Sequence, residues 1–237
     1  VLAGPLKLKE QPASSVSKME YHVRRRLQTD NVQHLIRVCK LTQLEAESVL
    51  WYTADFRTLD PDGSEDFNVY FLFNLALRNR SLAAIKRWSD FAWFLVNALR
   101  KLPAVKVDVF RGVPQRITAL SANYGKGKRV VWTSFTSTTV NRDEIMKSFG
   151  QGGTFMHIEV LDGRDISQLS MLPQEKEVLL MPNVQLLVDS VLSADEAAKF
   201  STKFGGALPQ DVDLILMKQV RMSELRSDLK DAAQHKT

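Results

Sequence analysis

The protein has 237 residues, of which 44% are hydrophobic and 25% are charged, and its formal net charge is +5 from 32 Lys and Arg against 27 Asp and Glu. A chain of this length buries roughly 70–75% of its unfolded surface, so its core needs no disulfide or metal. Cys39 is the only cysteine, which excludes an internal disulfide and favours a reducing compartment. The mild basic excess suits an anionic ligand such as a phosphate without indicating nucleic acid. The sequence has no run of about 18 apolar residues, so it predicts no membrane span.

The first hundred residues have a helical pattern. Residues 1–18 mix Gly, Pro, Ser and Lys without periodicity and are predicted to form a flexible lead-in, and the arginines at 24–26 are interpreted as a solvated helix end. In LTQLEAESVLWYTADF, Thr42 and Glu45 have the spacing of a capping box, which predicts a helix start. The stretches VYFLFNLALRNR and IKRWSDFAWFLVNALRKL have apolar residues at helical spacing. The aromatic side chains of the last stretch are assigned to the core: Trp88, Phe91, Trp93 and Phe94.

After Pro103 the pattern changes to short β-rich runs separated by Gly and Pro. These runs are VKVDVFRGV, RVVWTSFTSTT, GTFMHIEVL, EVLLMP, VQLLVDSVL and DVDLILMKQV. Most are not separated by a helix long enough for a βαβ crossover, which argues against a doubly wound parallel sheet. We therefore predict an α+β fold in which a helical N-terminal lobe (19–102) packs on a mixed, mostly antiparallel β core (103–221), as a single domain followed by a charged tail at 222–237.

Several kinds of chemistry have no support in the sequence. The four histidines are scattered and, with one cysteine, make no metal-ligand spacing, so we expect no metal. The stretch YGKGKR lacks the third glycine of a dinucleotide fingerprint and is followed by a strand-like run, so it is interpreted as a hairpin turn.

Three polar features remain, one on each of three β-rich runs. The first is Arg111 followed by Gly112 at a strand end, where a planar guanidinium suits phosphate oxygens and the glycine leaves the next peptide accessible. The second is the hydroxyl-rich run Thr136–Thr139 after Phe135. The third is the pair Glu175 and Glu177. As strand residues two apart, these would share one face with β-carbons roughly 7 Å apart.

In this order, the features resemble the R-S-E class of mono-ADP-ribosyltransferases, which includes arginine-specific vertebrate-type enzymes and actin-modifying bacterial toxins. The resemblance covers about residues 40–190 and includes FLFNLALRN in the helical part. Its most specific stretch is DISQLSMLPQEKEVLLMPN, because a target-recognition loop leads into the family's glutamates in this way. The resemblance implies a two-sheet ADP-ribosyltransferase fold and a transfer of ADP-ribose from NAD, used as a co-substrate, to an arginine of a protein.

The resemblance also implies where NAD binds. Arg111 would hold the NAD phosphates, and the main chain of Gly112 would receive the nicotinamide amide. Ser137 would orient the catalytic glutamate, with Thr138 and Thr139 supporting the strand. Phe149 lies where the family places an aromatic residue against the nicotinamide.

The two glutamates have separate implied roles. Glu177 is the catalytic position, and Glu175 is the position linked to arginine as acceptor. The chain departs from the pattern at Thr139, where serine is usual, and at Leu172, where several toxins have an aromatic residue. A second basic residue shortly after Phe149 is missing, and the candidates to replace it are Arg142 and Lys147.

Three alternatives stay open at this point. The chain could be an NAD glycohydrolase, in which water replaces the protein acceptor, or a non-catalytic module of the same fold that binds NAD or ADP-ribose. It could also be a plain α+β interaction domain. We expect a monomer that binds NAD and an arginine-bearing protein, without nucleic acid or membrane as a partner. The expected location is the cytoplasm, with a secreted effector acting inside a host cell as the alternative.

Overall fold

The computed structural model describes residues 13–59, 67–143, 145, 152–200 and 211–221. The chain forms two compact units. The first unit holds the chain up to Ala104 together with Thr133–Phe135 and Arg164–Met181, and the second holds Val105–Trp132, Thr136–Gly163 and the chain from Pro182 onward. The predicted tail at 222–237 lies outside the described residues.

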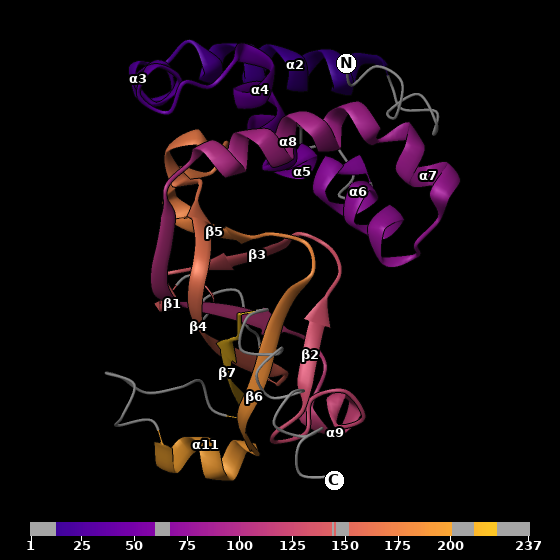
Figure 1. Ribbon diagram of the computed structural model, residues 1–237, viewed down its shortest axis with the longest axis vertical. Coiled ribbons are helices and arrows are strands. Elements are labelled where there is room, and N and C mark those ends of the chain that lie inside the picture. Colours follow the sequence, from indigo (N-terminus) through magenta and orange to yellow (C-terminus); the bar gives the residue numbers. More distant parts are fainter. Residues whose placement is uncertain (1–12, 60–66, 144, 146–151, 201–210, 222–237) are drawn as a thin grey trace, which may run out of the picture. The chain divides into compact units, whose positions relative to one another are not determined.

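The first unit is built mainly from helices (Figure 1). These are α2 (Ala13–Leu27), α3 (Asp30–Val38), α4 (Gln43–Tyr52), α5 (Phe56–Leu59), α6 (Val69–Arg78), α7 (Leu82–Arg87) and α8 (Ser89–Lys101). The unit also contains the 3-10 helices η2 (Ser167–Leu169) and η3 (Pro173–Glu175) and the strand β5 (Glu177–Leu180). The predicted lead-in is too long, because α2 begins at Ala13 and buries Met19, Val23 and Leu27 in the core.

Helix α4 begins at the predicted capping box. The Thr42 hydroxyl accepts the Glu45 N–H at 3.2 Å, and the Glu45 carboxylate accepts the Thr42 N–H at 2.6 Å. Lys101, in the last turn of α8, donates to the same carboxylate at 2.7 Å. Burial by itself raises the pKa of the Glu45 carboxyl, but hydrogen bonds from Lys101 and Thr42 outweigh it and hold the pKa below its usual value.

An aromatic cluster fills the core of this unit. The Phe73 ring lies 5.4 Å from Trp88, 5.2 Å from Phe91 and 5.6 Å from Phe135, centroid to centroid. Trp88 and Phe91 are buried as predicted, but Trp93 is 67% exposed, so its assignment to the core is wrong. The predicted helix through this stretch is also interrupted at Trp88, which separates α7 from α8.

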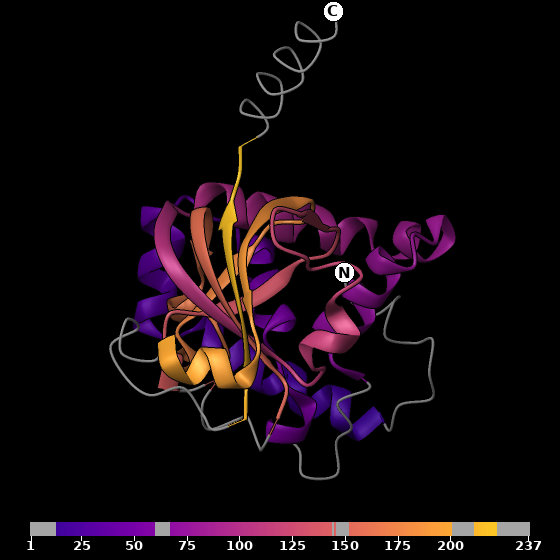
Figure 2. The same cartoon turned by 90° about the horizontal axis from the view of Figure 1, so that it is seen from below.

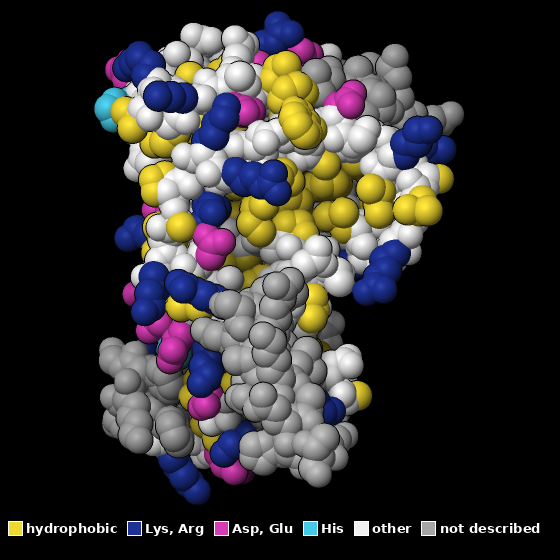
Figure 3. Space-filling view, viewed as in Figure 1, with side chains coloured by type: hydrophobic (Ala, Val, Ile, Leu, Met, Phe, Trp, Pro, Cys, Tyr) yellow, Lys and Arg dark blue, Asp and Glu magenta, His cyan; other side chains and the backbone are white. Residues whose placement is uncertain are grey.

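Apolar side chains also reach the surface of the helical unit. Figure 3 shows them gathered around α6 and α8. Tyr70, Phe71 and Leu75 of α6 are each a little more than a third exposed. Within the described residues, no helix is both long and apolar enough to cross a membrane.

The second unit is built mainly from strands. These are β1 (Ala104–Val113), β2 (Arg129–Trp132), β3 (Thr136–Thr139), β4 (Thr154–Asp165), β6 (Val184–Leu192) and β7 (Asp213–Gln219). Pairs β1–β3, β2–β6 and β6–β7 are antiparallel, β4–β7 is parallel, and β1 also pairs with β4. The predicted mixed, mostly antiparallel core is confirmed. Helix α11 (Ala194–Phe200) contacts β6 and β7 and lies beside them in Figure 2.

A buried carboxylate of this unit binds the first residues of two of its helices. Asp213, 3% exposed at the start of β7, accepts the N–H of Ile117 at 2.8 Å and the N–H of Ala194 at 3.0 Å. These two residues are the first of α9 (Ile117–Leu120) and α11. The first N–H groups of a helix have no partner inside the helix, so one side chain satisfies a donor at each helix.

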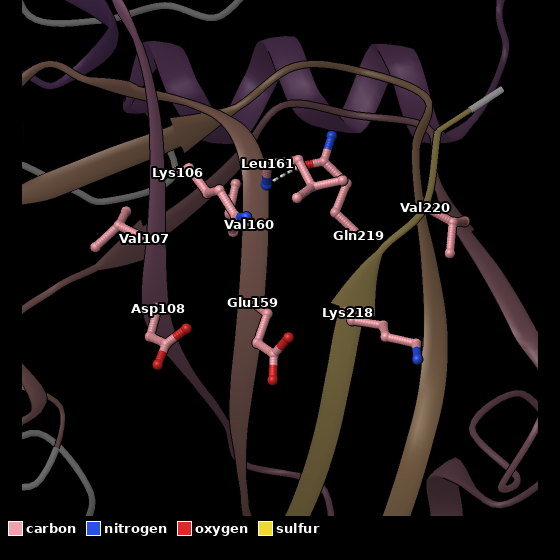
Figure 4. Close-up of a pocket in the computed structure, with 9 residues that line it drawn as sticks. All are labelled: Lys106, Val107, Asp108, Glu159, Val160, Leu161, Lys218, Gln219 and Val220. Carbon is pink, nitrogen blue, oxygen red and sulfur yellow. Dashed lines mark hydrogen bonds between the residues drawn. The ribbon is translucent and has the colours of Figure 1, made fainter. Parts of the chain in front are cut away.

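A pocket of about 470 Å³ opens on β1, β4 and β7 where β4 and β7 stop pairing. Figure 4 shows Lys106, Asp108, Glu159 and Lys218 as its charged lining. Beyond the last paired residues, the Gln219 side-chain oxygen accepts the N–H groups of Leu161 and Asp162 at 2.8 and 3.1 Å. The side chain therefore replaces the missing strand partner.

Candidate active site

Arg111 and Ser137 are brought together in the second unit. Arg111 is half-buried near the end of β1, and its Nη1 donates to the main-chain oxygen of Ser137, exposed on β3, at 2.7 Å. The two strands are in register through Phe110 and Thr139. The hydrogen bond restricts the movement of a guanidinium, the group that best matches the oxygens of a phosphate.

The residues around this pair have different environments. Gly112 follows Arg111 within β1, and Thr138 and Thr139 are buried on β3 at 3% and 8% exposure. The supporting role that the resemblance implies for these two hydroxyl residues stays a prediction. The role of Ser137 in orienting the catalytic glutamate stays a prediction.

Some predicted residues cannot be placed. Phe149 and Lys147 lie outside the described residues. Arg142, the other candidate for a second phosphate-binding residue, lies within them and is half-buried. The assignments of Phe149 and Arg142 stay predictions.

The two glutamates belong to the first unit and do not lie on one strand. Glu175 ends the 3-10 helix η3 and is half-buried, whereas Glu177 is the first residue of β5 and is 5% exposed. Lys176 between them is in the left-handed region, with φ 46° and ψ 50°. The prediction of a shared strand face is therefore wrong, and the separation of roughly 7 Å expected for strand residues does not apply.

Local hydrogen bonds explain this turn. Pro173 fixes its own φ and begins η3, and the Glu175 N–H then donates to the Leu172 oxygen at 3.1 Å. The strand pairing of β5 starts one residue after Lys176, where the Glu177 oxygen accepts the Ile166 N–H at 3.1 Å. The chain thus turns between the two carboxylates, which gives each its own direction and degree of exposure.

The aromatic residue ahead of the hydroxyl-rich run is a core residue. Phe135 is 3% exposed and packs on Phe73 and on Tyr52, whose ring centroid is 5.9 Å away. The residue that precedes β3 is therefore held in the core of the helical unit, and β3 starts with the next residue, Thr136.

Sequence reasoning missed Arg26. The arginines at 24–26 were expected to form a solvated helix end, but Arg26 is half-buried and donates to main-chain oxygens in the segment that leads to the glutamates. No local pattern indicates this contact, because its partners lie more than 140 residues away in the sequence.

The pocket of Figure 4 is lined by none of the described residues predicted for the active site. Its lysines and carboxylates come from the middle and ends of β1, β4 and β7. Within the described ranges, no group of three or more His, Cys, Asp or Glu side chains is arranged to hold a metal ion.

Comparison with solved structures identifies the fold. The chain resembles the ADP-ribosyltransferase HopU1 of Pseudomonas syringae pv. Tomato DC3000, with 20% identity, a TM-score of 0.63 and coverage of 85% of this chain and 87% of HopU1. It also resembles the Vis toxin of Vibrio splendidus (18% identity, TM-score 0.52, 94% and 92% coverage). A third match is the type III effector XopAI of Xanthomonas axonopodis pv. citri (16%, 0.56, 92% and 80%). The predicted ADP-ribosyltransferase fold is confirmed.

Sequence comparison identifies the family. A curated protein of Mycobacterium avium (strain 104), Mav, named as an NAD(+)–arginine ADP-ribosyltransferase, is 34% identical over 110 residues. The match covers 46% of this chain and 13% of Mav, so the chain spans only a small part of that relative's length. The family model described as NAD:arginine ADP-ribosyltransferase matches residues 13–201, which include Arg111, Ser137 and both glutamates. The chain therefore belongs to the NAD:arginine ADP-ribosyltransferase family.

Proposed function

We propose that the protein transfers ADP-ribose from NAD to the guanidinium of an arginine on a protein substrate and releases nicotinamide. Family membership supports the reaction class. The observation that carries the proposal is the arrangement of the two carboxylates, with Glu177 buried at a strand start and Glu175 half-buried on the turn before it. Two carboxylates in different environments suit two different tasks.

Arg111 is proposed to bind the pyrophosphate of NAD. Its guanidinium carries a permanent charge, and the hydrogen bond to the Ser137 oxygen restricts its rotation. A restricted guanidinium loses less side-chain entropy when phosphate binds than one on a mobile side chain. The peptide of Gly112 beside it has no side chain to obstruct the nicotinamide amide.

Glu177 is proposed to support the breaking bond. When the bond between the nicotinamide nitrogen and the ribose C1′ breaks, the electron pair leaves with nicotinamide and the sugar acquires oxocarbenium character, as in glycoside cleavage. A carboxylate fixed near that sugar stabilises the developing positive charge, a contribution of about 10²–10³ in rate for a preorganised group. The hydrogen bond from Ile166 to the Glu177 main chain fixes the backbone from which this carboxylate projects.

Glu175 is proposed to prepare the acceptor. A guanidinium has a pKa above about 12 and is not a nucleophile near neutral pH. The Glu175 carboxylate pairs with it, directs one nitrogen to C1′ and accepts the proton that this nitrogen loses as the new bond forms. The proton then passes to solvent. Glu175 is more exposed than Glu177, as a residue that meets a protein substrate must be.

Substituting each glutamate separately tests the proposal. Nicotinamide release and labelling of agmatine would be measured for the parent and for Glu177→Gln and Glu175→Gln. Agmatine is a suitable acceptor because it carries a free guanidinium, and Vis has been crystallised with it. Glu177→Gln should lower both activities at least about 10²-fold. Glu175→Gln should retain nicotinamide release and lose agmatine labelling.

Glu159→Gln provides the matched control, because Glu159 is an exposed carboxylate of β4 outside the predicted site. This variant should behave as the parent in both assays. If the parent releases nicotinamide but labels neither agmatine nor protein, the protein is an NAD glycohydrolase. If it does not release nicotinamide at all, the proposed function is wrong. The acceptor protein is expected in the cytoplasm, of either the producing cell or a host, where the free thiol of Cys39 stays reduced.

A further inference from the structure

The segment between β4 and β5 carries Glu175, leads directly into Glu177 and is held to the helices of its own unit. Two hydrogen bonds come from Arg26, in the last turn of α2. Its Nε donates to the Ser170 oxygen at 3.0 Å, and its Nη2 donates to the Gln168 oxygen at 3.1 Å. Its Nη1 lies 3.4 Å from the Thr29 hydroxyl, which anchors the guanidinium to the turn after α2.

Two more hydrogen bonds fix the same segment. The hydroxyl of Thr53, the C-cap of α4, accepts the Met171 N–H at 3.0 Å. The Ser170 side chain, which is fully buried, accepts the Leu172 N–H at 2.9 Å. The main chain is thus held from Gln168 to Leu172, and η3 with Glu175 at its end follows directly.

The two glutamates depend on these contacts to different degrees. Glu177 begins β5, and its main chain is paired with Ile166. Glu175 lies on a single turn whose hydrogen bond runs from its own N–H back to the Leu172 oxygen. The position of the Glu175 main chain therefore follows from the place of Leu172, and the place of Leu172 follows from the contacts of Arg26 and Thr53.

We propose that Arg26 is a positioning residue for the acceptor arginine: it fixes the segment that ends at Glu175 and so sets how the incoming guanidinium is aimed. This inference rests on the proposed function. An arginine suits the task because its rigid fork reaches two carbonyl oxygens two residues apart, which a lysine ammonium does not reproduce with fixed geometry. The neighbouring Arg24 and Arg25 are exposed, and Arg24 pairs with Glu20 on its own helix.

The test compares Arg26→Ala with Arg25→Ala, a matched change on the same helix. In Arg26→Ala the KM for agmatine should rise about tenfold, the effect expected from losing hydrogen bonds to a charged donor. Its nicotinamide release without acceptor should stay within about twofold of the parent, because Glu177 keeps its own strand contacts. Arg26→Lys should recover part of the loss, and Arg25→Ala should match the parent in both assays.

Amide hydrogen exchange supplies a readout that does not depend on activity. Exchange of the amides from Ser170 to Glu175 should speed up in Arg26→Ala and stay unchanged in Arg25→Ala, while the folded state persists in both by circular dichroism. If the parent has no transferase activity but exchange rises as expected, the proposed function fails and the positioning by Arg26 stands. Unchanged exchange, or an equal loss of hydrolysis and transfer in Arg26→Ala, would overturn the inference.

Discussion

The carboxylate of Glu45 joins the start of α4 to the end of α8, and replacing it tests how much this contact stabilises the helical unit. It is 6% exposed, completes the capping box with Thr42 and accepts from Lys101 on α8. Glu45→Gln keeps the shape and one acceptor oxygen but removes the charge. Glu45→Ala removes both hydrogen bonds to the carboxylate and leaves the bond from the main-chain N–H of residue 45 to the Thr42 hydroxyl.

The expected magnitudes follow from the contacts. Loss of the capping interaction costs about 1 kcal/mol. Loss of a hydrogen bond from a charged donor costs about 1.5–3 kcal/mol, but the Lys101 side chain is 37% exposed and regains water, so the lower end applies. Glu45→Ala should therefore lower the free energy of unfolding by about 2–3 kcal/mol, and Glu45→Gln by about 1 kcal/mol.

The pH dependence has a definite sign. Because the pKa of Glu45 is lower in the folded protein than in the unfolded chain, its stabilising effect is fully present above the unfolded pKa of about 4.3. The effect is lost as the pH falls through the folded pKa. Urea unfolding at pH 7, 5 and 3.5 should show the stability difference between the parent and Glu45→Gln narrowing as the pH falls.

The control is Glu47→Gln, a half-buried carboxylate of the same helix that accepts from Gln43 instead. Its stability difference from the parent should stay small at pH 7, since the hydrogen bond between Gln43 and Glu47 is exposed to solvent and such bonds contribute little. A gap between the parent and Glu45→Gln that is as wide at pH 3.5 as at pH 7 would refute the electrostatic account of Glu45.

Two further substitutions test the left-handed turn at Lys176 and the hydrogen bonds from the β4 main chain to Gln219. Lys176→Val should destabilise the protein by about 1–2 kcal/mol relative to Lys176→Gly in thermal unfolding. The reason is that a φ of 46° is unfavourable for a β-branched residue and costs glycine no strain. Equal stabilities of the two variants would show that the turn changes its conformation to accommodate valine. Gln219→Leu should cost about 1–3 kcal/mol in urea unfolding and speed exchange at the Leu161 amide, whereas Gln219→Glu keeps the accepting oxygen and should preserve both. Unchanged exchange in Gln219→Leu would mean that water replaces the side chain without cost.

Much of the fold was predictable because its signals are local. The Thr42–Glu45 capping box, the helical spacing of α6 and the alternation of β1 each depend on residues a few positions apart, and the structure has them where the sequence indicates. Trp93 is misplaced because apolar character alone does not determine which face of a helix is buried. It lies two residues from Phe91 and from Leu95, which are buried, so the helical period places it on the other face of α8.

The sequence suggests which residues form the candidate site, and their roles stay predictions, but it does not indicate their geometry. The order of Arg111, Ser137 and the two glutamates is visible in the sequence. The turn at Lys176 is not visible, because Lys has no preference for the left-handed region and the strand pairing that begins after it is a tertiary contact. Arg26 was missed for the same reason, since its partners are 142 and 144 residues away.

The helical unit is assembled from separate stretches of the chain, and this has a consequence for its biogenesis. Phe135 and Leu179 are part of its apolar core together with residues from α2 to α8. During synthesis, which adds about 5–20 residues per second, the helices leave the ribosome several seconds before these two side chains do. The nascent unit therefore exposes an unfinished core throughout that interval, and no N-terminal fragment that ends before Met181 contains all of its segments. We expect that expression of the helices alone, ending at Ala104, gives an aggregating product, and that the gene must be kept intact through the codon of Met181 for the unit to fold.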